Sequence, residues 1–450
     1  MEKKDYIAKL EDLTAEQIVE GIIAGIVTFE ALKRTGEFGA DKQKSVKTFL
    51  RKKDDEAFAA ANTVAALQNY LSIFPAGNHV DEATEKIRMI RDEEIAEERK
   101  QYEREKMLGE IKEDINEYTP DEIIDKLSGE VLDDLCRELD IDAQMIRNYT
   151  EPTLKFNVIP QSEEDIPAGY TDVFFWGIPS SGKTCALSAI FSTIKKSYSM
   201  EAPDCDLKFG ATYRDSLTNI FRNDCGYLPG RTNRDRTQYM PFLLYKRGEK
   251  SKRKISFFEL SGEVFKYFYE KANSSHIIDD YDREDIEKSF QTLELLLQSN
   301  NQKIHFFFID YNQETKHSID SNGLTQGNYL EAAATYFRDA KKAGKPVDIF
   351  KKKTDAVYVV VTKSDEMRGD DRNASAKSFL NENFGAFMDV LKNQCNRHSV
   401  DFRVKLFSIG DVYFKKICKI NRAYSIDIIE DLMNRVKPVS DSKIRNFFNS

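Results

Sequence analysis

The sequence lacks the cysteine and histidine groupings that mark a zinc-binding or disulfide-rich protein. Its 450 residues include six cysteines and five histidines. The cysteines are scattered, none forms a C-x-x-C pair, and the histidines do not cluster with them. A zinc site or a disulfide framework is therefore not expected, and the reducing environment of the cytoplasm fits best.

Long apolar runs and an excess of positive charge are also missing. The most apolar early stretch, residues 18–29, contains Glu20 and is too short to cross a bilayer. The first residues lead into a charged helical pattern rather than a signal peptide. The formal net charge of −9 argues against a general nucleic-acid binder. We therefore expect no transmembrane segment, and the sequence carries no strong nucleic-acid signal, although a local basic patch is compatible with this charge.

The most informative segment that is present matches the phosphate-binding pattern G-x-x-x-x-G-K-[ST] at residues 177–184, after an apolar run and before a helical pattern. Gly177 and Gly182 allow backbone angles that direct several N–H groups at one phosphate, and the helix adds its positive end. Lys183 is expected to reach the β- and γ-phosphates, and the Thr184 hydroxyl to bind Mg²⁺. The other loop positions expected to contact a nucleotide are Ser180, Ser181 and Cys185.

The composition changes near residue 155, from helix and turn to alternating strands and helices. Thr14 and Thr119 each begin a short helical unit as a capping residue, so two copies of a helical hairpin are expected. The segment between them resembles a tetratricopeptide-type helix pair. The expected domains are a helical hairpin module at 1–50, the tetratricopeptide-like pair at 51–118, a second helical hairpin module at 119–155 and a P-loop α/β domain at 170–440.

Several apolar runs in the last domain, such as residues 304–309 and 357–361, are apolar on both faces. That pattern is typical of a mostly parallel sheet covered by helices on both sides, so the fold class is α/β after an all-α region. The expected strands are 172–178, 239–245, 254–260, 303–310, 356–362 and 403–409. The expected helices are 183–197, 284–299, 326–342, 374–396 and 424–435.

A second motif indicates which base is bound. Thr362, Lys363 and Asp365 follow the strand at 356–362, at the sheet edge where a ligand is expected. A carboxylate there can accept hydrogen bonds from the ring N–H and the exocyclic amino group of guanine, whereas adenine offers no such donor pair. The methylene stem of Lys363 can lie along the base.

In this order, the motifs resemble the Ras-like, translation-factor class of P-loop GTPases, over about residues 170–435. Glu259 and Gly262 stand where that family has D-x-x-G, whose acidic residue holds Mg²⁺ through water and whose glycine N–H binds the γ-phosphate. Glutamate for aspartate is a departure that keeps the charge and adds a methylene. Ser408 resembles the serine or threonine of the family's last base-contacting loop.

The resemblance implies two further roles. Glu263 stands where many members carry the glutamine that orients the attacking water, and a carboxylate there repels the γ-phosphate and slows hydrolysis. Alternatively, Glu263 points away from the phosphate, or it is simply a helix-start residue. The first switch is expected at residues 228–237, with Thr232 as the first choice and Thr237 as the second for the threonine that contacts Mg²⁺. The candidates for an internal arginine finger, or for plain surface residues, are Arg231, Arg234 and Arg236.

The sequence thus predicts a protein that binds GTP or GDP with Mg²⁺ and hydrolyses GTP as a molecular switch, with protein partners on its N-terminal helices. A scaffold that binds GTP without hydrolysing it is the first alternative, and an ATPase is the second. The glutamate-containing signature and the helical adaptor resemble divergent bacterial GTPases proposed to act in multi-component defence or stress systems.

Overall fold

The computed structural model describes residues 3–36, 38–203, 209–230, 237–312, 323–338, 350 and 353–439. The chain divides into two compact units, residues 1–113 and residues 114–450. Residues 231–236, which include Arg231, Thr232, Arg234 and Arg236, lie outside the described residues.

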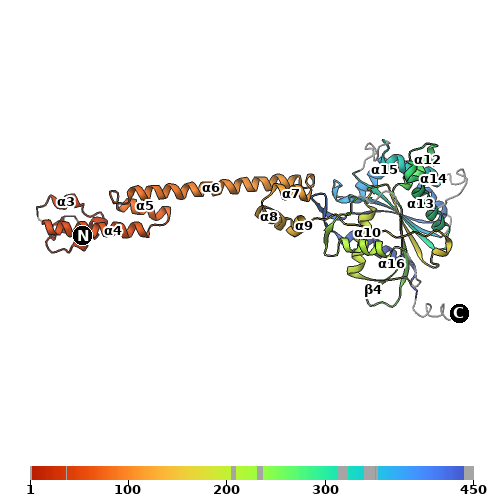
Figure 1. Ribbon diagram of the computed structural model, residues 1–450, viewed down its shortest axis with the longest axis horizontal. Helices are drawn as coiled ribbons and strands as arrows, with labels where there is room; N and C mark the ends of the chain where they lie inside the picture. Colours follow the sequence, from red (N-terminus) through yellow and green to blue (C-terminus); the bar gives the residue numbers. More distant parts are fainter. Residues whose placement is uncertain are drawn as a thin grey trace. The chain divides into compact units, whose positions relative to one another are not determined.

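The first unit is entirely helical in its described part (Figure 1). Thr14 caps α2 through a reciprocal pair of hydrogen bonds with Gln17, which confirms the predicted capping role. Helix α4 runs through residue 50, where a module boundary was expected. The helices of this unit are α1 (Lys3–Ala8), α2 (Ala15–Ile23), α3 (Phe29–Lys33), α4 (Ala40–Ala60), α5 (Val64–Ile73) and α6 (Val80–Glu113).

Helices α5 and α6 form the helix pair expected in the middle of this region. Phe58 and Tyr70 are buried together at the turn, where Asp54 accepts hydrogen bonds from the Tyr70 hydroxyl (2.6 Å) and from the N–H of Asn78 (2.6 Å). Most of α6 beyond Ile90 is exposed and charged. None of the helices in the described part of the chain could span a bilayer.

The second unit begins with a small helical module at residues 114–149. Thr119 caps α7 by the same reciprocal arrangement, with Glu122. The Tyr227 hydroxyl donates to the carbonyl of Met145 (2.9 Å), and Lys419 pairs with Asp140, so the module packs on a three-stranded sheet of order β3-β10-β9. The helices are η1 (Ile115–Glu117), α7 (Pro120–Lys126), α8 (Gly129–Leu139) and α9 (Ala143–Arg147), and the strands are β3 (Cys225–Tyr227), β9 (Gly410–Tyr413) and β10 (Ile417–Ile420).

A seven-stranded sheet of order β2-β4-β5-β1-β6-β7-β8 forms the centre of the second unit. Strands β5, β1, β6, β7 and β8 run parallel, and β4 and β2 extend one edge in antiparallel pairs. The strands are β1 (Thr171–Trp176), β2 (Tyr198–Glu201), β4 (Gln238–Lys246), β5 (Arg253–Glu259), β6 (Gln302–Asp310), β7 (Thr354–Thr362) and β8 (Asp401–Leu406). The expected mostly parallel sheet is confirmed.

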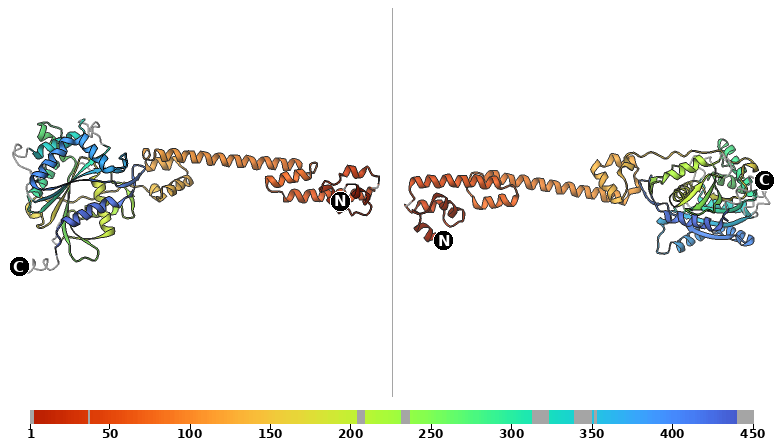
Figure 2. Two further views of the ribbon diagram at one scale, coloured as in Figure 1. Left: turned by 180° about the vertical axis from the view of Figure 1, so that it is seen from behind. Right: turned by 90° about the horizontal axis from the view of Figure 1, so that it is seen from below.

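Helices cover both faces of this sheet, as the two buried clusters show (Figures 1 and 2). Within β1, Phe174 packs into the cluster under α12–α15, and the next residue, Phe175, packs under α10, α11 and α16. The helices are α10 (Lys183–Ser197), α11 (Ala211–Ile220), α12 (Val264–Asn273), α13 (Asp280–Gln298), α14 (Gln326–Arg338), α15 (Arg372–His398) and α16 (Arg422–Arg435), with short turns at η2 (Glu163–Asp165) and η3 (Ser364–Glu366).

The buried carboxylate of Asp172, near the amino end of β1, is hydrogen-bonded to residues of β4, of β5 and of the loop before β6. Asp172 accepts hydrogen bonds from Ser256, from the Asn301 amide (3.1 Å) and from the hydroxyls of Ser299 (3.3 Å) and Tyr239 (3.5 Å). A buried carboxylate with this many donors is stable because each polar group has a partner.

We predict that Asp172→Ala lowers the free energy of unfolding of the second unit by about 3 kcal/mol, because buried donors lose their acceptor. The only tryptophan, Trp176, is buried in β1, so its fluorescence during denaturant unfolding reports on this unit. Asp55→Ala, in the first unit, is the control and leaves that transition in place. An unchanged transition in Asp172→Ala would contradict this view of the network.

Candidate functional site

The loop between β1 and α10 has the conformation that its glycines allow. Gly182 has φ of +87° and precedes the first turn of α10, and Ser180 at the exposed tip has φ of +63°. The N–H groups in the first turn of an α-helix have no partner within the helix. Because Lys183, Thr184 and Cys185 occupy that turn, their N–H groups face the space enclosed by the loop.

The Lys183 side chain lies inside the loop. Its Nζ donates to the carbonyls of Gly177 (2.6 Å) and Ile178 (2.9 Å). Burial lowers the pKa of Lys183 to about 8, although the negative charges of Glu259 and Glu263 oppose that change. The Lys183 ammonium group therefore loses its proton at a pH only slightly above neutral. The loop at residues 177–184 contains no carboxylate side chain.

Glu259, the last residue of β5, connects three elements of the site. Its Oε1 accepts from the Thr184 hydroxyl (2.6 Å), and its Oε2 accepts from the Tyr213 hydroxyl of α11 (2.6 Å). Burial raises the pKa of Glu259, while the two hydroxyls and the charge of Lys183 oppose the rise. Glu259 is 4% exposed, so each of its carboxylate oxygens needs such a donor.

The segment after β5 lies directly against the phosphate-type loop. A side chain at Gly262 would collide with the backbone N of Pro179, so only glycine permits this contact. Glu263 follows at the start of α12 and is 6% exposed. Its Oε2 lies 2.7 Å from Nζ of Lys266, one helical turn later. Glu263 thus already has a cationic partner within its own helix.

The end of β7 is bonded to the same loop. The Thr362 hydroxyl donates to the carbonyl of Ser181 (3.1 Å). Lys363 has φ of +55°, and its Nζ lies 2.9 Å from the buried Oδ2 of Asp310 at the end of β6. The carboxyl ends of β1, β5, β6 and β7 therefore meet at one site.

Asp365 and Ser408 line one cavity of about 610 Å³ beside this edge. Asp365 is exposed in η3, and Ser408 is buried in the loop after β8, where its hydroxyl accepts from the N–H of Gly410 (3.2 Å). The N–H of Ser364 donates to the carbonyl of Phe407 (3.2 Å), which holds the two loops together. The structure thus brings the two residues predicted to contact a base to one cavity.

Of the threonines and arginines expected to act in the first switch, Thr237 is the one that lies in the described part of the chain. Its hydroxyl accepts from the N–H of Ser261 (3.1 Å), and it is 2% exposed. The predictions for Thr232 and for Arg231, Arg234 and Arg236 stay outside the described residues.

Sequence reasoning missed two residues of the site, Tyr213 and Asp310. Asp310 ends a buried apolar strand. A carboxylate at that end of a strand, where ligands bind at the sheet edge, could have identified it from the sequence. No comparable signal marked Tyr213, because its contact with Glu259 spans 46 positions of sequence.

The oxygen donors at this edge suit a magnesium ion. Mg²⁺ binds proteins through one or two oxygen ligands and takes the rest from water and substrate phosphates. Thr184 and Glu259 supply two such oxygens side by side. Within the described residues, no group of three or more histidine, cysteine, aspartate or glutamate side chains forms a metal site that the protein alone could complete.

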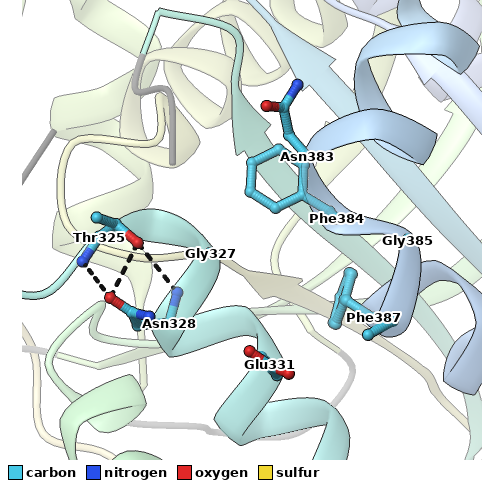
Figure 3. A pocket seen from close by; sticks show the side chains of 9 residues that line it. Thr325, Gly327, Asn328, Glu331, Asn383, Phe384, Gly385 and Phe387 are labelled. Atoms are coloured by element: carbon cyan, nitrogen blue, oxygen red, sulfur yellow. Dashed lines mark hydrogen bonds between the residues drawn. The ribbon is translucent and has the colours of Figure 1, made fainter. Parts of the chain in front are cut away.

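A second cavity, of about 260 Å³, lies between the start of α14 and a kink of α15 at Phe384 (Figure 3). Its polar side chains are used within the fold, since Asn328 Oδ1 accepts from the N–H (2.9 Å) and hydroxyl (3.0 Å) of Thr325 at the start of α14. Glu331 is the only ionisable residue that lines it. This cavity therefore lies beside the hydrogen-bonded cap of α14, and its lining does not resemble that of a site for a charged ligand.

No protein-family model matches the sequence, and no curated protein does. Among solved structures, the GTPase-like domain of Ski7 from S. cerevisiae, bound to GTP, is similar over 53% of this chain and 43% of that chain, at 11% identity and a TM-score of 0.27. This chain therefore spans less than half of that structure. A protein described as nucleolar GTP-binding protein 1 from Plasmodium falciparum is similar over 54% of this chain and 79% of that one, at 12% identity and a TM-score of 0.21. At these identities and scores, neither similarity carries an argument about function.

We predict that inorganic tripolyphosphate binds about tenfold more weakly at pH 9 than at pH 7, because Lys183, with a pKa of about 8, must take up a proton to pair with it at the higher pH. Isothermal titration calorimetry measures both affinities. Lys183→Met serves as the control, because any effect of tripolyphosphate's own protonation on binding is the same for the parent and for this variant. An equal pH dependence in the parent and in Lys183→Met would show that Lys183 does not hold the anion.

Proposed function

We propose that the chain binds a guanine nucleotide with Mg²⁺ at the carboxyl edge of its sheet and hydrolyses GTP slowly, as a molecular switch. One observation carries the proposal: the loop at Gly182 and the carboxylate of Asp365 lie at one edge, connected by the Thr362–Ser181 hydrogen bond of 3.1 Å. A phosphate chain in the loop and a base at Asp365 are opposite ends of one molecule. The strand order changes direction beside β1, where open α/β sheets bind their ligands.

The base end is read by hydrogen-bond donors. The carboxylate of Asp365 accepts from the ring N–H and amino group of guanine, and adenine would leave it without donors. Ser408 lines the cavity near the same group, and the volume of about 610 Å³ suits a ligand of this size. The ammonium group of Lys363 pairs with Asp310, and its methylene stem is the part that would lie along the base.

The phosphate end is held by the backbone N–H groups of Ser180, Ser181 and the first turn of α10, and by Lys183. Gly262, whose backbone lies against the loop, donates its N–H to the terminal phosphate. Thr184 and Glu259 are the residues that hold Mg²⁺, which neutralises phosphate charge when bound. Thr232 stays the first choice for the switch threonine, outside the described residues, and Thr237 stays the second, with its hydroxyl bonded to the loop that follows Glu259.

Protein partners at the helical regions complete the proposal. Helix α6 exposes large apolar side chains at Met89, Ile95 and Tyr102, which suit contacts with another protein. The scattered cysteines support a cytoplasmic location. Loops that order on GTP and relax on hydrolysis are the usual way in which such a switch reports its state.

A scaffold that binds GTP without hydrolysing it is the second candidate. The ion pair between Glu263 and Lys266 favours it, because a carboxylate held in that pair does not orient an attacking water. The rate of single-turnover GTP hydrolysis distinguishes the two candidates, since it is slow for the switch and zero for the scaffold.

We predict that Asp365→Asn lowers the affinity for GTP about a hundredfold, because a charge-assisted pair of hydrogen bonds is lost. The same variant gains affinity for xanthosine triphosphate, whose base has a carbonyl where guanine has an amino group. Calorimetry with both nucleotides measures the change. The control is Asp370→Asn, an exposed aspartate that does not line the cavity, and it leaves both affinities unchanged. If Asp365→Asn prefers GTP over xanthosine triphosphate as strongly as the parent does, Asp365 does not contact the base.

We also predict that Glu263→Gln speeds single-turnover GTP hydrolysis about tenfold, since it removes a negative charge near the terminal phosphate and lowers the barrier by about 1.4 kcal/mol. Lys266→Met has the opposite effect, because it leaves the Glu263 charge without its partner. The rate is measured with GTP in Mg²⁺ buffer. GTP that stays intact in the parent and in both variants would favour the scaffold.

A further inference from the structure

Glu259 is one methylene longer than the aspartate that the resemblance leads one to expect, and the longer side chain has one more torsion to fix. The structure fixes it from two sides. Thr184 Oγ1 lies 2.6 Å from one carboxylate oxygen, and the Tyr213 hydroxyl lies 2.6 Å from the other. The tyrosine side chain is fully buried, and its hydroxyl interacts with both Glu259 and the side chain of Thr184.

Tyr213 is itself held in place by a short segment that comes from outside the sheet. Helix α11 begins after Gly210, which has no side chain to cap it. Asn157 supplies the missing cap, since its Oδ1 accepts from the N–H of Tyr213 (3.0 Å). The ring of Phe156 stacks on the ring of Tyr213, with centroids 5.5 Å apart and planes at 24°.

The same asparagine also grips the strand next to Glu259. The N–H of Asn157 donates to Oε1 of Gln238 (3.0 Å), and the Gln238 amide donates to the carbonyl of Asn157 (3.2 Å). Gln238 pairs with Glu259 in the β4–β5 ladder. Asn157 thus bonds two elements that both contact Glu259, one through α11 and one through β4.

We propose that Tyr213 is a positioning residue for metal binding: its hydroxyl sets the orientation of the Glu259 carboxylate beside Thr184, and Asn157 sets Tyr213. The inference rests on the proposed function, because it assigns to Glu259 the role of a magnesium-holding carboxylate. Donors that orient a metal-binding carboxylate contribute about 10–100-fold to metal affinity in other proteins. The Tyr213 hydroxyl therefore restricts the additional side-chain torsion of Glu259, which a shorter aspartate side chain does not have.

The test measures the release of fluorescent N-methylanthraniloyl-GDP as free Mg²⁺ is varied, and again in EDTA. In Tyr213→Phe, which keeps the ring and loses the hydroxyl, the Mg²⁺ concentration for half-maximal retention rises about tenfold. Release in EDTA keeps the parent rate, since the nucleotide contacts remain. Asn157→Ala shifts the Mg²⁺ dependence in the same direction. In a Glu259→Gln background, Tyr213→Phe has no further effect, because the carboxylate is already absent.

Tyr239→Phe is the matched control. It removes the hydroxyl of another fully buried tyrosine, one that bonds the carboxylate of Asp172, and it leaves the Mg²⁺ dependence unchanged. A Tyr213→Phe protein with the parent Mg²⁺ dependence would overturn the inference and leave the proposed function intact. A parent chain that retains no GDP at any Mg²⁺ concentration would overturn the proposed function, and the inference with it.

Discussion

The hydrogen bond from Thr362 to the carbonyl of Ser181 joins the two halves of the site, and the account of function depends on it. Thr362 ends β7 and precedes the segment that carries Asp365, while Ser181 belongs to the loop after β1. Between them lies β6, whose last residue, Asp310, pairs with Lys363. Parallel strands place their carboxyl ends at one edge of a sheet. Residues nearly two hundred positions apart can therefore hold one small ligand.

Buried charged side chains gather at this edge, among them the cation Lys183 and the carboxylates Glu259, Glu263 and Asp310. Burial of a charged group is costly unless it has polar partners. Lys183 donates to loop carbonyls, Glu259 accepts from Thr184 and Tyr213, and Glu263 pairs with Lys266. Under the proposed function, a bound triphosphate would add negative charge here, which a magnesium ion and protonated Lys183 would offset.

The sequence predicted the parts of this domain that follow from local pattern. The buried strands, α10 and the loop glycines have periodicity or backbone requirements that are visible in the chain, and the structure confirms the strands and the helix. The helices α11 and α12, the short strand β2 and the three-stranded sheet were missed. Short strands such as Cys225–Tyr227 become strands only through their tertiary partners. Tyr213 and Asn157 were missed for the same reason: their roles depend on contacts that no spacing encodes. Thr14 and Thr119, by contrast, act through neighbours three residues away and were predicted as caps.

The central claim is that one guanine nucleotide is held at both ends, by the loop around Gly182 and by Asp365. Its most direct test is the pair of affinities for GTP and ATP, measured by calorimetry on the full chain at one Mg²⁺ concentration. Because guanine offers the Asp365 carboxylate two hydrogen-bond donors and adenine offers no matching pair, GTP is predicted to bind at least about a hundredfold more tightly than ATP. Equal affinities for the two nucleotides would contradict it, since the phosphate loop would then act without the carboxylate.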